Sequence, residues 1–203
     1  MSKKQKLQKE IERQKDIYWN KFLAHRAVLQ DYGYLNEDYP TEKGKTTSQI
    51  RSENELFLAE IIFSGVLETL TPAQLAGVIC AITTEELRLE IPYIPFSEPI
   101  RKTLNKIRDI KKKLYKAQTS HDIESPLNIN PYFSSLIELW VEGAEWSTVS
   151  EQVEMGEGDI VRAFKRVVDV LRQLTTIDNV PEALVFTARE AIDNIMRAPV
   201  DVD

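Results

Sequence analysis

Glycine and proline are scarce in this 203-residue chain, and their scarcity favours long, uninterrupted elements. Only seven glycines and nine prolines occur, and residues 3–32 contain neither. These two residues are the main breakers of regular structure, so long gaps between them favour helices over short strands joined by turns. Apolar residues recur at helical spacing in this segment, namely Leu7, Ile11, Tyr18, Phe22 and Leu29. A long helix is therefore predicted, whose sparsely apolar first half projects or rests on something outside this chain.

The next segment, "GYLNEDYPTEKGKTTSQI" (residues 33–50), has the composition of a turn-rich hairpin. Gly33 is predicted to end the preceding helix in the C′ position, where a left-handed backbone favours glycine. Two short extended pieces separated by turn residues predict a β-hairpin. A helix followed by a hairpin is typical of the last part of a winged-helix domain.

Capping signals and helical periodicity organise the rest of the chain. Thr71, Pro72 and Gln74 fit the N-cap, N1 and N3 positions of a capping box and open what should be the most buried helix. Ser97 is expected to cap a helix that reaches about residue 117, after a proline-rich loop over residues 91–100. Asn130 is expected to cap a helix that ends at Gly143.

A second capping box is expected from Thr148 and Glu151, between a short helix and a long one. Further helices are predicted over residues 53–65 and 181–196. The predicted fold is all-α: a helical bundle of about six to eight helices, preceded by a long helix and a small winged-helix-like β-hairpin.

Charge is strongly segregated along the chain. The formal net charge is -6, yet residues 101–116 carry eight basic side chains and one acidic one. On a helical wheel the apolar residues of this segment share one arc, and the opposite arc holds Arg101, Lys102, Lys106, Arg108, Lys112, Lys113 and Lys116. Two interpretations stay open: a solvated basic face, or contact with a polyanion or an acidic partner.

Residues 157–174, "EGDIVRAFKRVVDVLRQL", form the second basic segment. On a helical wheel, four polar side chains fall in one line on the side opposite the apolar face: Arg162, Arg166, Asp169 and Gln173. Two further cations, Lys165 and Arg172, flank this line. Guanidinium groups bind phosphates or stack on bases, and a carboxylate or amide accepts hydrogen bonds from a base or a 2′-hydroxyl. The alternative is an ordinary solvated helix face.

Motifs for metal or nucleotide chemistry are missing from the sequence. Cys80 is the only cysteine and is expected to be a buried core thiol, and His25 and His121 lie far apart, so no zinc spacing occurs. "EKGKT" at 42–46 resembles the end of a P-loop, but Tyr39 stands where a P-loop needs glycine. No apolar run approaches the ~20 residues of a membrane helix. We therefore expect a cytoplasmic, monomeric chain without membrane contact, metal site, catalytic residues or bound cofactor.

The sequence also resembles a known family. "SENELFLAEIIFSGVLETLTPAQLAGVICAITTEE" followed by "LWVEGAEWSTVSEQVEMGEGDIVRAFKRVVDVLRQL" is similar to the DSHCT domain, the C-terminal helical bundle of superkiller-type (Ski-two-like) DExH-box RNA helicases. The passage "LQDYGYLNEDYPTEKGKTTSQI" resembles the segment that closes the winged-helix domain of these enzymes. The resemblance covers about residues 22–198.

The resemblance implies a division of the chain and a function. Residues 1–21 would be a stalk-like helix left from an inserted arch, residues 22–52 the end of the winged-helix region, and residues 53–203 the DSHCT bundle. The helix at 157–174 would be the ratchet helix that contacts single-stranded RNA, with Arg166 and Asp169 in the family's RNA-contacting positions. A RecA-like helicase core, in cis or in trans, would bind ATP and magnesium and power unwinding in RNA processing or decay.

Two other functions remain open from the sequence. A helix-turn-helix DNA-binding regulator would use residues 158–174 as its recognition helix and would usually dimerise on duplex half-sites. A helical protein-interaction adaptor would bind no nucleic acid and would present the basic 101–116 face to a partner.

Overall fold

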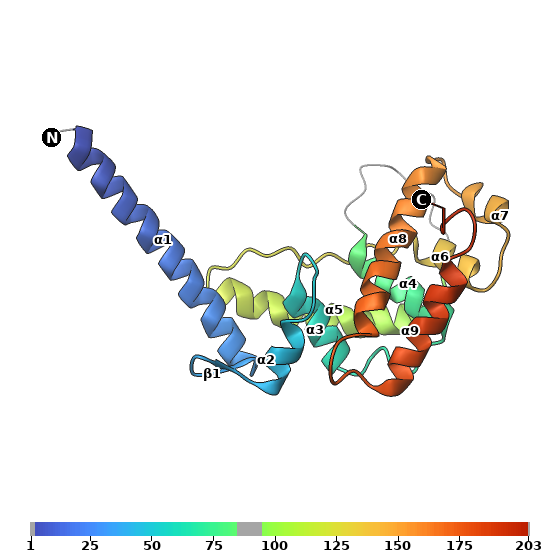
Figure 1. Cartoon of the computed structure of the whole chain (residues 1–203), viewed down its shortest axis with the longest axis horizontal. Coiled ribbons are helices and arrows are strands. Elements are labelled where there is room, and N and C mark those ends of the chain that lie inside the picture. The colour runs from blue at the N-terminus through green and yellow to red at the C-terminus, as the bar shows by residue number, and fades with distance from the viewer. Residues whose placement is uncertain (1–2, 85–94, 203) are drawn as a thin grey trace.

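The computed structural model describes residues 3–84 and 95–202, and Figure 1 shows their arrangement. In these residues nine helices and one small hairpin form a mostly helical molecule, which confirms the predicted all-α class. Residues 91–94 of the expected proline-rich loop, and the side chains of Leu7 and Ile11, lie outside what is described.

The long N-terminal helix α1 spans Lys3–Asp31 and projects away from the rest of the molecule (Figure 1). Its described side chains up to Phe22 are exposed, and only its last turns are packed, with Val28 buried. Gly33 follows with a φ of 73°, as predicted for a residue that ends a helix in the left-handed conformation. The side chains described up to Phe22 are therefore not part of the core.

The predicted hairpin is present but very short. Strand β1 (Leu35–Asn36) pairs antiparallel with β2 (Tyr39–Pro40). The chain then forms the short helix α2 (Glu42–Thr47), which the sequence patterns did not predict. The Thr41 hydroxyl accepts a hydrogen bond from the Gly44 backbone N–H, and such an N-cap stabilises a helix start.

A polar network ties this region to helix α3 (Glu55–Phe63). The buried Tyr34 hydroxyl donates to Glu60 at 2.6 Å, and Lys43 pairs with the same carboxylate at 2.6 Å. The Lys43 ammonium also lies 4.2 Å from the centre of the Tyr34 ring. Burial and the Glu60 carboxylate raise the pKa of Tyr34, so the phenol stays protonated and keeps donating.

Helix α4 (Pro72–Thr83) is the centre of the bundle. The predicted capping box is present: Thr71 accepts from the Gln74 N–H, and the Gln74 side chain accepts from the Thr71 N–H. Cys80 is fully buried, and burial raises the pKa of its thiol to about 12. It is therefore a core residue, as expected from the sequence.

Helix α5 (Glu98–Ser120) follows the predicted wheel. Ile100, Leu104, Ile107 and Leu114 are buried, whereas the seven basic residues of the opposite arc are exposed. Ser97 occupies the N-cap position, but its side chain makes no capping bond. Its backbone N–H donates instead to Glu138 at 3.0 Å, so a carboxylate from another helix supports this end of α5.

Two other capping predictions were wrong. Helix α6 is Ser134–Val141 with Phe133 at its N-cap, and Asn130 instead accepts a bond from the Tyr132 N–H in the preceding turn. Thr148 lies inside the short helix α7 (Trp146–Ser150) and Glu151 follows that helix, so they do not form a capping box. In both cases the helix begins three residues from the expected N-cap, at Phe133 rather than Asn130 and at Glu145 rather than Thr148.

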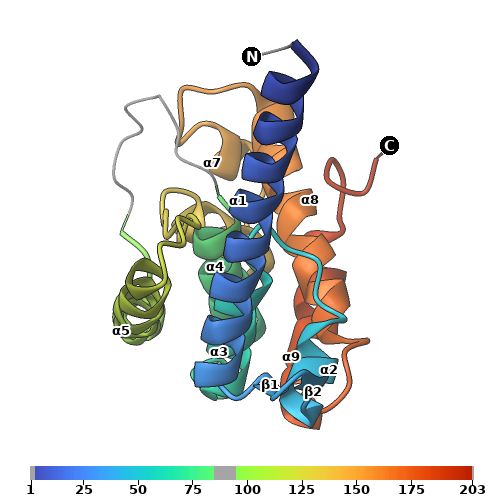
Figure 2. The same cartoon turned by 90° about the vertical axis from the view of Figure 1, so that its left-hand side faces the viewer.

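The core is built on both sides of α4. Helices α6, α8 (Glu157–Leu174) and α9 (Glu182–Ile195) pack on it together with α5, which also contacts α3. In Figure 2, α3 and α4 lie in the middle, with α5 at one edge and α8 and α9 at the other. The buried Trp140 indole donates to the Ile195 carbonyl at 2.9 Å, which joins α6 to the end of α9.

Candidate nucleic-acid interface

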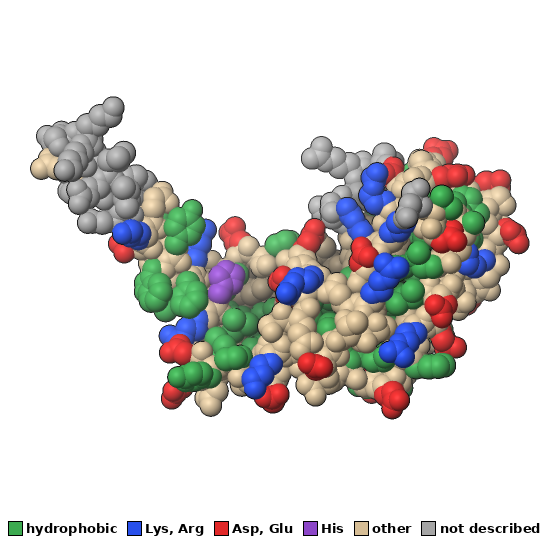
Figure 3. All heavy atoms as spheres, viewed as in Figure 1, with side chains coloured by type: hydrophobic (Ala, Val, Ile, Leu, Met, Phe, Trp, Pro, Cys, Tyr) green, Lys and Arg blue, Asp and Glu red, His purple; other side chains and the backbone are tan. Residues whose placement is uncertain are grey.

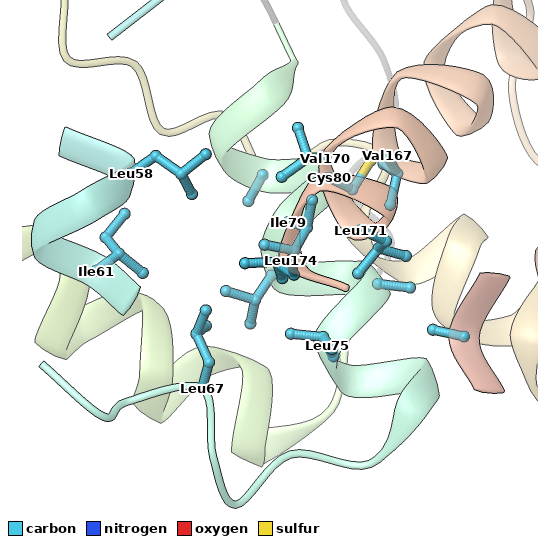
Figure 4. Packing of buried hydrophobic residues seen from close by; sticks show 14 of the residues in the cluster. Leu58, Ile61, Leu67, Leu75, Ile79, Cys80, Val167, Val170, Leu171 and Leu174 are labelled. Carbon is cyan, nitrogen blue, oxygen red and sulfur yellow. The ribbon is translucent and has the colours of Figure 1, made fainter. Parts of the chain in front are cut away.

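Helix α8 is fixed in orientation by its apolar face. Its buried residues are Ile160, Phe164, Val167, Val168, Val170, Leu171 and Leu174. Several of them meet Leu75, Ile79 and Cys80 of α4 in one cluster, as Figure 4 shows. Gly156 stands at the N-cap without a side-chain bond, while Glu157 and Asp159 in the first turn suit the helix dipole. The predicted apolar face is confirmed.

The opposite face of α8 is exposed and carries the predicted line of polar side chains. Arg162, Arg166 and Asp169 are exposed, and Gln173 is half-buried. Arg162 pairs with Asp159 at 3.0 Å, and Arg172 lies 3.9 Å from Asp169. Exposed ion pairs of this kind contribute only about 0–1 kcal/mol, so a phosphate can replace them at small cost. Figure 3 shows Lys and Arg side chains gathered over α8 on this side of the molecule.

Gln173 binds the backbone of a distant segment. Its amide oxygen accepts from the Arg51 N–H at 2.6 Å, and its amide nitrogen donates to the Arg51 carbonyl at 3.0 Å. Nearby, the Gln49 amide nitrogen donates to the Asp178 carboxylate at 2.7 Å, and its amide oxygen accepts from the Asp178 N–H at 3.1 Å. These four bonds hold residues 49–51, which connect α2 to α3, against the C-terminal end of α8.

A groove of about 260 Å³ lies where this segment meets α8. Arg166, Asp169 and Gln173 line one wall, and Arg51 lines the other. Hydrogen-bonding side chains complete it, from the 51–53 segment, the end of α4 and the loop before α6: Ser52, Glu53, Thr83, Thr84 and Asn128. The groove thus combines two arginines with two carboxylates and several neutral donors and acceptors. The guanidinium groups can bind phosphates, and the carboxylates and amides can accept hydrogen bonds from bases or 2′-hydroxyls.

Two of the predicted residues lie beside the groove rather than in it. Lys165 donates to the backbone carbonyl of Val202 at 2.9 Å, near the C-terminus. Arg162 stands one turn before Arg166 toward the N-terminal end of α8. Both add positive charge to the exposed side of the helix, while Arg166, Asp169 and Gln173 line the groove itself.

Sequence reasoning missed the far wall of the groove. Arg51, Thr83, Thr84 and Asn128 belong to segments that are far apart in the chain, and none carries a motif of its own. The one local hint is the position of Arg51, just after the hairpin region and before the Asn54 N-cap of α3. Pairing it with Gln173 requires knowing how α8 lies against the 49–51 segment.

The described residues do not fit ATP or magnesium. No group of three or more His, Cys, Asp or Glu side chains among them could hold a metal ion. The "EKGKT" stretch is the body of α2, and a Cβ on Gly44 would lie 2.2 Å from the Tyr34 carbonyl oxygen, so that glycine serves close packing. Among the residues that the structure describes, no helix has the length and apolar character that crossing a membrane requires.

The fold and the groove together define a class: a helical bundle domain with one Arg-rich helix facing a polar groove. Residues 37–203 match the DSHCT (NUC185) domain family, and the chain belongs to this family. The match confirms the resemblance seen in the sequence, to the C-terminal region of DExH-box RNA helicases. Helix α1 lies before the matched residues.

Several curated proteins are similar to this chain. The chloroplastic DExH-box ATP-dependent RNA helicase DExH15 of Arabidopsis thaliana is 29% identical over 190 residues, which is 90% of this chain and 16% of that protein. The ATP-dependent RNA helicase mtr4 of Schizosaccharomyces pombe is 26% identical over 159 residues, 74% of this chain and 14% of the helicase. The probable helicase HelY of Mycobacterium tuberculosis is 28% identical over 183 residues, 84% of this chain and 20% of HelY. The chain thus spans a fifth or less of these relatives.

Proposed function

We propose that this chain is the RNA-contacting C-terminal helical domain of an ATP-dependent DExH-box RNA helicase, with α8 as its ratchet helix. The observation that carries the proposal is the groove between α8 and residues 51–53, which is lined by Arg166 and Asp169. Membership of the DSHCT family and the names of the similar helicases support it.

The groove residues have distinct roles in this proposal. Arg166 binds a phosphate or stacks on a base, and Asp169 accepts a hydrogen bond from a base or a 2′-hydroxyl. Gln173 holds Arg51 on the facing wall through the two bonds described above. Arg162 and Lys165 raise the local positive potential, which increases the rate of encounter with RNA.

The remaining parts follow the division expected from the sequence. Residues 1–21 are the stalk-like helix, residues 22–52 the end of a winged-helix region, and residues 53–203 the bundle. A RecA-like core, in cis or in trans, supplies ATP hydrolysis with magnesium, and this chain holds the single strand during RNA processing or decay. The monomeric state and the cytoplasmic location remain predictions; one relative is named as chloroplastic.

The test is an Arg166→Ala variant measured by fluorescence anisotropy with a labelled single-stranded RNA at low salt. We expect roughly tenfold weaker binding, since a lost stacking or phosphate contact is worth about 1–3 kcal/mol. Arg189→Ala removes an exposed arginine of α9 and serves as the matched control, with unchanged affinity expected.

Equal affinities of the Arg166→Ala and Arg189→Ala variants would exclude the groove as the RNA site. A preference for duplex DNA together with a dimer in sedimentation would favour the helix-turn-helix regulator. Absence of any nucleic-acid binding by the unmodified chain would favour the protein-interaction adaptor.

A further inference from the structure

The outward face of α5 is the most strongly basic surface of the described chain outside α8. The helix contains eight basic and two acidic residues in a protein whose formal net charge is -6. Seven of the basic side chains are exposed: Arg101, Lys102, Lys106, Arg108, Lys112, Lys113 and Lys116. Over these residues the helix is about 22 Å long, at ~1.5 Å per residue. We refer to these seven residues together as the α5 basic face.

The packing of α5 fixes the direction of this face. The buried side consists of Ile100, Thr103, Leu104, Ile107, Leu114 and Gln118, which pack toward α4 and α3. Turning the helix to hide its cations would expose this apolar side to water, which is strongly unfavourable. The α5 basic face is therefore a permanent feature of the surface.

Only part of its charge is neutralised. Glu98 pairs with Arg101 and lies 3.9 Å from Lys102, and Asp109 lies 3.5 Å from Lys112. Lys106, Lys113 and Lys116 form no ion pair with any side chain that the structure describes.

Like charges also repeat one turn apart on this helix. Lys102 precedes Lys106 by four residues, and Lys112 precedes Lys116 by the same spacing. Like-charged pairs at this spacing destabilise a helix. A bound polyanion would relieve this repulsion.

We propose that the α5 basic face is a second RNA-binding surface, which holds the phosphate backbone of a strand. Protein interfaces are depleted in lysine and need an apolar centre. Here the exposed side of α5 offers a single large apolar residue, Tyr115, at 59% exposure. Tyr115 follows Lys112 by three residues and precedes Lys116, so its ring lies among the cations, where it can stack on a base.

This surface is separate from the groove beside α8. Helix α4 packs against both α5 and α8 and lies between them, as Figure 2 also shows. The inference therefore goes beyond the proposed function of α8, and it can fail or hold independently of the groove.

The experiment measures how the affinity of the full chain for a ~40-nucleotide single-stranded RNA depends on salt. The variant Lys106→Gln/Lys113→Gln/Lys116→Gln removes three exposed charges and keeps good helix formers. Lys15→Gln/Lys21→Gln/Arg189→Gln removes three exposed charges elsewhere and is the matched control. Changing the same three α5 lysines to arginine keeps the charge, and circular dichroism verifies the fold of each variant.

We expect the Gln variant of α5 to bind roughly tenfold more weakly at ~0.1 M salt. The slope of log K plotted against log[salt] should become less steep by about 2, because three phosphate contacts are lost and each accounts for ~0.7 on a single strand. The Arg variant should bind like the unmodified chain. Tyr115→Ala should weaken binding several-fold and Tyr115→Phe should not, because only the ring is needed for stacking.

The proposal is overturned if the α5 Gln variant keeps the affinity and the salt slope of the control. Binding of an acidic peptide that is lost in this variant, with RNA binding unchanged, would assign the face to a protein partner instead. The groove is tested separately, because an unaffected Arg166→Ala variant contradicts the proposed function of α8 and leaves the α5 result standing.

Discussion

Gln173 shows how one side chain can serve the structure while lying on a functional face. It was placed in line with Arg162, Arg166 and Asp169 by periodicity, yet its amide group binds both polar backbone atoms of Arg51. A neutral amide can donate and accept at once, which a carboxylate or an ammonium group cannot do. Its contribution to the groove is therefore to hold Arg51 opposite Arg166.

A Gln173→Ala variant should release residue 51 from α8. We expect a loss of about 1–2 kcal/mol in the free energy of unfolding, since the two exposed hydrogen bonds to Arg51 and a weaker one to the Asp169 carbonyl are lost. Amide hydrogen exchange at Arg51 should become faster, because Gln173 is the acceptor of that N–H. Gln152→Ala, which removes one local bond to Thr148, is the control and should leave this amide unchanged. Unaltered exchange at Arg51 would mean that the clamp does not form in solution.

Helix α4 determines how closely the neighbouring helices can approach. At Gly77 a Cβ atom would lie 2.5 Å from Ile100 Cδ1 of α5 and 3.1 Å from the Ser134 carbonyl oxygen of α6. The Ser134 hydroxyl donates to the Gly77 carbonyl at 2.7 Å, so α6 is bonded to the backbone of α4 at this point. The absence of a side chain at this position is thus what allows three helices to meet.

Gly77→Ala should destabilise the protein although alanine is the better helix former. Alanine gains about 1 kcal/mol in helix propensity, but overpacking at a buried contact costs about 1–3 kcal/mol. We expect a net loss of about 1 kcal/mol in urea unfolding. Gly158→Ala in the first turn of α8 is the control: its Cβ would meet nothing within 4 Å, so this change should be neutral or stabilising. Equal effects of the two changes would show that α4 can shift to accommodate a methyl group.

The whole molecule consists of a packed bundle and a projecting helix. None of the side chains described in residues 14–22 is buried, whereas α1 contacts β1 and α5 and has Val28 buried near its C-terminal end. Trp19 and Phe22 stack on each other with ring centres 5.3 Å apart, yet both remain more than half exposed. The described side chains of residues 14–22 therefore add little buried surface to the bundle.

Deleting residues 1–21 should leave the thermal unfolding midpoint within about 3 °C of the full chain. The reason is that the deletion removes no described buried side chain. At this chain length, a change of ~1 kcal/mol in the free energy of unfolding shifts the midpoint by roughly 2–4 °C. Differential scanning calorimetry measures the midpoint. The comparison is a deletion of residues 1–31, which also removes the buried Val28 and should lower the midpoint clearly. A large decrease for the shorter deletion would contradict this expectation.

The sequence by itself determined the longer helices, their buried faces and the family, but not the short helix α2. A period of 3.6 residues is local information, so the apolar arcs of α5 and α8 and the Thr71 capping box could be identified from neighbouring residues alone. The same local evidence failed for Asn130 and for Thr148 with Glu151. The observed N-caps are Phe133 and Glu145, and neither makes a side-chain capping bond, so capping chemistry does not mark where these helices begin.

Only the tertiary structure decided which residues from other segments lie next to the exposed face of α8. The groove joins Arg51, Thr83, Asn128 and Arg166, and no local pattern relates these positions. Their proximity depends on α4 and α8 packing together and on the bonds between Gln173 and Arg51. A helical wheel gives the direction of each side chain from its own helix axis, whereas a binding site requires the relative placement of several axes, which the packing of the core fixes.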